Sequence, residues 1–253
     1  MAFLIPDRTR VETLPGGQTV TVNEKIIPDS MVAPKDVASY VKKGQKMKPC
    51  FPLGGDGKPR AITIHNTGDI KVAAGTNAAE QYARATLNGN MGGVVVHYYV
   101  WHSDVWQLLA ESERGWHAAD GASRRTDHTG KQTGGNIDTI AIEVIGKDEE
   151  SVETAKKLAA AICIRHGFDP AIHLYTHNYW MYGVDAMKTG VSKNCPVYIL
   201  PTWPSFVADV VRLCKENAPE IGAIFSMTKA DGDRAEAMLQ QYGFSYRRWL
   251  QTE

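Results

Sequence analysis

The chain has no net charge, no long apolar run and few cysteines. Its 253 residues include 28 Lys and Arg against 28 Asp and Glu. Dedicated nucleic-acid binders and polybasic membrane binders need an excess of Lys and Arg to contact phosphates. The balance argues against both classes, although it leaves local charged patches open. With 43% hydrophobic and 22% charged residues, the composition is that of a globular protein, which excludes wholesale disorder.

A membrane-spanning segment is also missing, because no stretch approaches the roughly 20 consecutive apolar residues that a spanning helix needs. The first ten residues, MAFLIPDRTR, contain a short apolar stretch that Pro6 and Asp7 interrupt. They lack the charged n-region, the full h-region and the cleavage site of a signal peptide. We therefore expect a protein that is made in the cytoplasm without a signal peptide.

The four cysteines are too scattered for a disulfide framework. Cys50, Cys163, Cys195 and Cys214 show no dense spacing of the kind found in small secreted domains. The simplest interpretation is four reduced thiols.

Length and punctuation predict one main domain with flanking segments. Residues 1–58 are rich in Pro and Gly, and we expect an N-terminal extension that packs on the core, with one short helix at 34–43. Residues 59–217 carry the main pattern of strands and helices. Residues 218–253 show a small βαβ-like pattern, which is too short to fold confidently alone. We expect this last segment to pack on the main domain or to mediate association.

The central region mixes strand and helix signals, which predicts an α/β fold with a mixed central sheet flanked by helices. The 139–146 segment alternates, so Ile140, Ile142 and Val144 should face opposite to Ala141, Glu143 and Ile145. Residues 118–136 have no apolar period, which predicts a long exposed loop. Strands are expected at 61–65, 94–101, 105–111 and 139–146, and helices at 77–89, 152–163 and 206–217.

Three residues of metal-ligating type occur in separate segments. His65 closes the strand AITIH, His177 lies in LYTHNYW, and Cys195 lies in SKNCP. These separations match no zinc finger, whose four ligands are closely paired, but three dispersed ligands suit a catalytic zinc that keeps a water in the fourth position. On spacing alone, two ordinary histidines and a buried thiol explain the same residues.

The surrounding motifs favour the metal site. In order, ITIHNTG, VVVHYYVW, GWHAAD, a Gly/Asn loop, IAIEVIG, THNYW and KNCP resemble the zinc N-acetylmuramoyl-L-alanine amidases of phage endolysins and bacterial autolysins, which are related to peptidoglycan recognition proteins. The resemblance covers residues 60–213. It implies the amidase and peptidoglycan-recognition fold. It also implies hydrolysis, by a zinc-activated water, of the amide bond between N-acetylmuramic acid and L-alanine.

The resemblance also implies roles for individual residues. His65, His177 and Cys195 match the three zinc ligands of the family, and Glu143 matches its acidic residue beside the metal. Lys193, two residues before the cysteine, matches a basic residue near the metal. Amide hydrolysis needs these types, because a carboxylate can move the proton of water and a cation can stabilise the oxyanion.

Substrate contacts are expected from His117, Asn66 and Tyr99; His97 and His117 lie at places where members of the resembled family line the cleft. His97 has two open interpretations, a cleft residue or a core histidine that holds the sheet together, and we favour the second. Tyr98 could stack beside the site as readily as Tyr99, although strand propensity alone explains both tyrosines.

One departure from the family pattern is an insertion, MYGVDAMKTGV, between the second histidine and the KxC motif. It leaves His173 as a rival second ligand. We prefer His177, because the NYW that follows it resembles the aromatic tail of the family.

The resulting hypothesis is an endolysin that binds cell-wall peptidoglycan, uses Zn²⁺, and reaches the wall after release across the membrane. A non-catalytic peptidoglycan-recognition protein is the alternative, and retention of Cys195 disfavours it. A structural zinc domain is disfavoured because only three protein ligands are evident. The segment 218–253 is a candidate for wall targeting or self-association.

Overall fold

In the computed structural model, the described residues are 3–36, 41–68, 77–118, 125–181 and 194–215. They belong to the first of two compact units, Met1–Glu216 and Asn217–Glu253. The βαβ-like segment expected at 218–253 lies outside the described residues, and so does Lys193. Within the described part of the chain, no helix is long and apolar enough to cross a bilayer.

The described residues form one mixed sheet of seven strands in the order β1-β2-β5-β4-β6-β3-β7. Strand β3 pairs in parallel with β6 and β7, and β4 pairs in parallel with β6. Two antiparallel pairs, β1–β2 and β4–β5, complete the mixture that the sequence predicts. The strands are β1 (Arg8–Thr13), β2 (Thr19–Glu24), β3 (Ala61–Asn66), β4 (Tyr98–Trp101), β5 (Asp104–Gln107), β6 (Thr139–Val144) and β7 (Leu174–Thr176).

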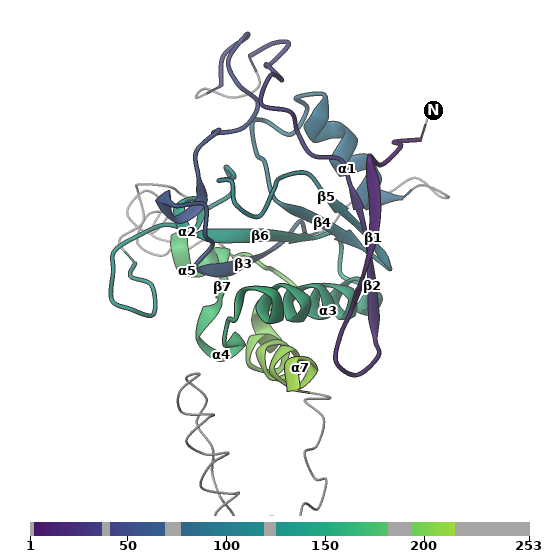
Figure 1. The fold of residues 1–253 in the computed structure, drawn as a ribbon, viewed down its shortest axis with the longest axis vertical. Coiled ribbons are helices and arrows are strands. Elements are labelled where there is room, and N and C mark those ends of the chain that lie inside the picture. The colour runs from purple at the N-terminus through teal and green to yellow at the C-terminus, as the bar shows by residue number, and fades with distance from the viewer. Residues whose placement is uncertain (1–2, 37–40, 69–76, 119–124, 182–193, 216–253) are drawn as a thin grey trace, which may run out of the picture. The chain divides into compact units, whose positions relative to one another are not determined.

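Helices lie on both faces of the sheet, with α3 and α7 on one face and α1 on the other (Figure 1). The α-helices are α1 (Ala78–Leu87), α2 (Gly135–Asp138), α3 (Glu149–His166), α4 (Pro170–His173), α5 (His177–Met181) and α7 (Trp203–Lys215), and short 3-10 turns occur at Leu53–Gly55 and Leu200–Thr202.

Helices α1 and α3 begin at residues that cap a helix N-terminus, and α3 ends at a glycine. Asn77 is the N-cap of α1, because its side chain accepts a hydrogen bond from the backbone N–H of Glu80 at 3.0 Å. Asp148 caps α3 in the same way through Ser151, at 2.7 Å. Gly167 ends α3 with a φ of +68°, a left-handed conformation that glycine adopts without a Cβ penalty.

Strand β6 divides the interior into two cores. Its even-numbered side chains pack with α3 and α7, namely Ile140, Ile142 and Val144. Ala141 and Ile145 belong to the opposite core, with residues of α1. The predicted alternation is confirmed, and it places Glu143 on the α1 face of the sheet.

The N-terminal region enters the fold more deeply than an extension packed on the core. Its strand β2 alternates exposed and buried residues, with Val20 and Val22 inside, and pairs in parallel with β5. Ile27 and Met47 are buried in the core on the α1 face. The helix expected at 34–43 falls partly outside the described residues, and the described residues of that range are not helical.

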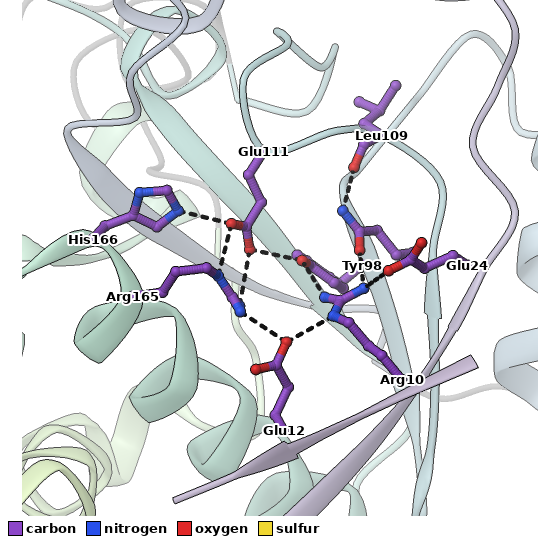
Figure 2. A network of polar contacts seen from close by, with 9 residues as sticks. Arg10, Glu12, Glu24, Tyr98, Leu109, Glu111, Arg165 and His166 are labelled. Atoms are coloured by element: carbon purple, nitrogen blue, oxygen red, sulfur yellow. Dashed lines mark hydrogen bonds and ion pairs between the residues drawn. The ribbon is translucent and has the colours of Figure 1, made fainter. Parts of the chain in front are cut away.

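A network of polar side chains joins β1 to α3 (Figure 2). Its centre is the Glu111 carboxylate, which accepts hydrogen bonds from the Tyr98 hydroxyl at 2.7 Å and from Arg165, and lies 2.7 Å from His166 Nε2. Arg165 also donates to Glu12 on β1 at 2.7 Å. The β1–β2 hairpin is therefore held to α3 by ion pairs, and the hydrogen bonds between β2 and β5 hold it to the rest of the sheet.

The prediction of a long exposed loop at 118–136 is wrong for its last residues, 133–136, which are buried. Residues 119–124 lie outside the described residues, but Thr133 and Asn136 are buried. Their polar atoms have internal partners, since the Thr133 hydroxyl donates to Asp138 at 2.5 Å and Asn136 accepts two backbone N–H groups. A polar sequence is buried here because its hydrogen bonds are made within the protein.

Candidate metal centre

His65, His177 and Cys195 meet at one point of the structure. Their ligand atoms all lie within 4.8 Å of one another, and all three side chains are buried. The Nδ1 atoms of the two histidines are 3.0 Å apart. Within the described residues, no other group of three or more His, Cys, Asp or Glu side chains is close enough to hold a metal ion.

The topology explains this convergence. Strands β3 and β7 are parallel neighbours, so their carboxyl ends lie at the same edge of the sheet. His65 is near the end of β3, and His177 directly follows β7. The third segment is fixed by two bonds, because the Cys195 carbonyl accepts from Asn178 N at 2.7 Å and its thiol donates to the Asn66 carbonyl at 3.8 Å.

The donor set fits zinc. Two imidazole nitrogens and one sulfur are ligands that Zn²⁺ prefers, and three protein ligands leave a fourth tetrahedral position open. Calcium and magnesium would instead require oxygen ligands. His173 is not in the group: it ends α4 at the other end of β7, where its ring stacks on Phe168 with centroids 5.1 Å apart.

His117 contacts the group directly. Its Nδ1 lies 2.9 Å from His65 Nε2, on the side of that ring opposite His177. The Asn136 side chain accepts hydrogen bonds from the backbone N–H groups of His117 and Ala118, both at 2.6 Å. Burial keeps the pKa of His117 well below its ordinary value, so the ring is neutral at pH 7. The sequence did not indicate this role of Asn136, because an asparagine after two glycines is typical of a turn.

Glu143 lies beside His65, because the two residues are register partners on the parallel strands β3 and β6. It is half-buried and lines a cavity that His65, His177 and Cys195 also line. Tyr99 also lines this cavity, and its hydroxyl is 2.9 Å from the Thr86 hydroxyl. Burial, and then the charge of Glu143, raise the pKa of Tyr82 and help to keep both tyrosines protonated.

Asn66 lines the cavity, but its side-chain amide bonds to the main chain. Its Nδ2 donates to the carbonyls of Val144 at 2.8 Å and Gly146 at 2.6 Å, and its Oδ1 accepts from Tyr198 N at 3.3 Å. These bonds tie the end of β3 to the end of β6 and to the segment after Cys195. The geometry is that of a residue that positions the site.

The cavity around these residues has a volume of about 640 Å³ and an open mouth. Its polar lining residues include His65, His177, Cys195, Glu143 and Asn194. Its apolar side includes Tyr82 of α1 and residues that sequence reasoning missed, namely Met91, Val94 and Val197. Apolar loop residues carry no local signal for a cleft, so only their placement in the fold identifies them.

His97 is a core histidine, as the favoured interpretation holds. It has no exposed surface, its Nε2 is 2.8 Å from the Glu113 carbonyl, and its Nδ1 accepts from Ala141 N at 3.0 Å. Burial lowers its pKa to about 4. The neutral ring therefore joins β6 to the segment after β5.

Residues 55–197 match the model of the Amidase_2 family, described as N-acetylmuramoyl-L-alanine amidase. The chain belongs to this family. The resemblance inferred from the sequence motifs is thereby confirmed. The part of this chain that matches the family contains His65, Glu143, His177 and Cys195.

Curated relatives carry the same description. N-acetylmuramoyl-L-alanine amidase XlyA of Bacillus subtilis is 26% identical over 178 residues, which are 69% of this chain and 50% of the relative. N-acetylmuramoyl-L-alanine amidase CwlH of the same organism is 29% identical over 153 residues, covering 59% of this chain and 52% of the relative. The chain thus spans about half the length of the curated relatives it matches.

Solved structures agree on the fold. The catalytic domain of XlyA superimposes with a TM-score of 0.54 at 26% identity, covering 76% of this chain and 99% of that one. A mutant endolysin from Bacillus subtilis superimposes with a TM-score of 0.52 at the same identity and coverage. The expected fold class, a mixed sheet flanked by helices as in amidase catalytic domains, is confirmed.

Proposed function

We propose that this protein is a peptidoglycan hydrolase that cleaves the amide bond between N-acetylmuramic acid and L-alanine. The observation that carries the proposal is the meeting of His65, His177 and Cys195 with Glu143 in one cavity. This cavity lies in the region that matches the amidase family, and the curated relatives are named for the same activity.

We further propose that His65, His177 and Cys195 hold Zn²⁺. The ion would lower the pKa of a coordinated water to about 7 and polarise the scissile carbonyl. The chain's own part is to hold the three donors in place. His117 keeps the far nitrogen of His65 engaged, which fixes the tautomer and leaves Nδ1 directed toward His177.

Glu143 is proposed as the general acid and base. Its carboxylate would accept a proton from the attacking water and return it to the departing amine nitrogen. Its register position beside His65 supports this role. Lys193 is proposed to stabilise the oxyanion by its charge, and it lies outside the described residues.

Three residues are proposed to shape the substrate side of the cavity. His117 and Tyr99 line it; His117 Nδ1 contacts His65 and the Tyr99 hydroxyl contacts Thr86, whereas His117 Nε2 has no hydrogen-bond partner in the described part of the chain. Asn66 acts by positioning, because its amide is bonded to the main chain. Substrate contact is therefore proposed through His117, whose Nε2 can still form a hydrogen bond, and through the ring of Tyr99.

For the whole chain we propose three regions: 1–58, which completes the sheet and core, 59–217, which is catalytic, and 218–253, which targets the wall or self-associates. We also propose that the protein is made in the cytoplasm and acts on the wall after release across the membrane.

The deciding experiment is product analysis on purified peptidoglycan with the metal content measured in the same sample. We expect new L-alanine amino groups and no new reducing sugars, with activity lost on chelation and restored by zinc. Glu143→Gln should keep the fold and the metal while turnover falls about 10²- to 10⁴-fold. Wall binding without any cleavage by the zinc-loaded protein would instead identify a recognition protein, and new reducing ends would identify a glycosidase.

A further inference from the structure

A second cavity lies away from the candidate metal centre, at the opposite end of strands β3 and β7. It has a volume of about 490 Å³ and is formed by the residues before β3, the 127–131 loop, the end of α3 and the end of α4. Arg60 precedes β3 and His65 follows five residues later, which corresponds to about 16 Å along a strand. The lining residues are Lys58, Pro59, Arg60, Asp127, His128, Thr129, Lys131, His166, Gly167, Phe168 and His173.

The cavity offers more hydrogen-bond donors than acceptors. Lys58 and Lys131 are exposed, and neither ammonium group has an acidic partner among the described residues. Arg60 is paired with Asp56 at 2.9 Å, so its charge is largely offset. The single lining carboxylate, Asp127, is turned to its own loop, where its Oδ1 accepts from Thr129 N at 2.9 Å and from Lys131 N at 3.0 Å.

Aromatic and imidazole rings also line this cavity. Phe168 stacks between His166 and His173, with ring centroids 5.4 Å and 5.1 Å away. His128 meets His173 edge to face at 4.2 Å. These ring contacts hold the histidines together, and an imidazole carries an N–H group that can donate a hydrogen bond.

Two carbonyl groups in the last turn of α3 are occupied by hydrogen bonds within the chain, which reduces their repulsion of a negative ligand. The carbonyls of Cys163 and Ile164 accept from the N–H groups of Phe168 and Gly167, at 2.8 and 3.4 Å. Two of the four last-turn acceptors, which would otherwise favour a cation, are therefore satisfied within the chain. An acceptor-rich anion fits such a site better than a neutral or cationic ligand does.

We propose that this cavity is a binding subsite for the phosphate or carboxylate groups of an anionic cell-wall polymer. Lys58 and Lys131 provide the charge, and the histidine edges provide directed hydrogen bonds. Because the cavity and the metal centre lie at opposite ends of β3 and β7, a polymer chain along this edge of the sheet would reach both. That the anion belongs to the wall rests on the proposed function, whereas anion binding itself does not.

The first test measures anion binding by the full chain. Inorganic phosphate, dimethyl phosphate and acetate are titrated at constant ionic strength, and the ring C–H signals of His128 and His173 are followed by NMR. We expect saturable shifts, and an affinity about tenfold weaker in the double variant Lys58→Gln/Lys131→Gln, because charge-assisted hydrogen bonds are the strong ones.

The matched control is Lys42→Gln/Lys43→Gln, which removes the same charge from two exposed lysines outside the cavity. Binding should be unchanged in this control. Shifts that do not saturate, or an equal loss of affinity in both double variants, would overturn the subsite. Saturation by dimethyl phosphate alone assigns the site to a phosphodiester, and saturation by acetate alone assigns it to a carboxylate.

The second test uses walls in a Glu143→Gln background, so that cleavage does not interfere. The fraction of protein that sediments with intact walls should fall in the Lys58/Lys131 variant. If the ligand is a phosphodiester, the Lys58/Lys131 variant and its Glu143→Gln parent should sediment to the same extent with walls stripped of phosphodiester polymers. Unchanged sedimentation in every case would refute the wall ligand.

With Glu143 intact, amide cleavage of a soluble muropeptide should be equal in the cavity variant and the parent chain. Absence of cleavage in both, with anion binding retained, would refute the proposed function and leave the anion site standing.

Discussion

The Glu111 carboxylate makes the stability of this fold depend on pH in a way that can be calculated. The residue lies at the centre of the network in Figure 2, with a side chain only 13% exposed. Burial by itself would raise its pKa. The bonds from His166, Arg165 and Tyr98 outweigh burial and lower the pKa of Glu111 from 4.5 to about 2.

The magnitude follows from this difference. Each pKa unit between the folded and unfolded states is worth about 1.4 kcal/mol, so the ionised carboxylate contributes about 3 kcal/mol. Because the folded pKa is the lower one, this contribution is complete above pH 4.5 and is lost as the pH falls to about 2. Glu111→Gln removes it at every pH.

The assay is urea denaturation of the wild type and of Glu111→Gln between pH 7 and pH 2. The free energies of unfolding should differ by about 3 kcal/mol at pH 7 and should converge as the pH approaches 2. Glu150→Gln is the control, since it removes a carboxylate that is 60% exposed and should cost less than about 1 kcal/mol. Parallel curves for wild type and Glu111→Gln across the whole range would refute the reasoning.

Three further outcomes test the site and its support. Asn136→Ala should lower the free energy of unfolding by about 1–3 kcal/mol, because two buried N–H groups lose their acceptor; chemical denaturation measures this, and no change would mean that water replaces the amide. Gly115→Ala should destabilise the fold by at least about 1–3 kcal/mol, since a Cβ there would lie 2.5 Å from the Val95 carbonyl oxygen; thermal melting measures it, with Gly44→Ala, which meets no atom within 4 Å but has a positive φ, as a milder comparison. Cys195→Ser should lower the zinc content after dialysis against a weak chelator while circular dichroism is preserved, and full retention of zinc would remove the thiolate from the proposed ligand set.

Features that depend on neighbours in sequence could be predicted. The cap at Asn77, the end of α3 at Gly167 and the alternation in β6 are local signals, and each is found in the structure. The grouping of His65, His177 and Cys195 could be anticipated only through ordered motifs, because the first two are separated by 112 residues and spacing alone carried little weight.

Features that depend on distant partners could not be predicted. Strand β2 was missed because its short Thr/Val alternation lies among turn residues, and its place in the sheet is set by β5, far along the chain. The burial of Asn136 depends on backbone N–H groups 18 and 19 residues away. Asn66 was expected at the substrate, but its amide bonds to the main chain at positions no local pattern indicates.

The register of β3 against β6 fixes the backbone spacing between two residues of the candidate site. His65 and Glu143 are partners on adjacent parallel strands, so the spacing of their backbones is the inter-strand distance of about 4.8 Å that main-chain hydrogen bonds impose. Loops around the cavity can lengthen or exchange residues without altering this spacing. Changes in those loops can therefore alter what the cavity recognises while the backbones of His65 and Glu143 keep the same separation.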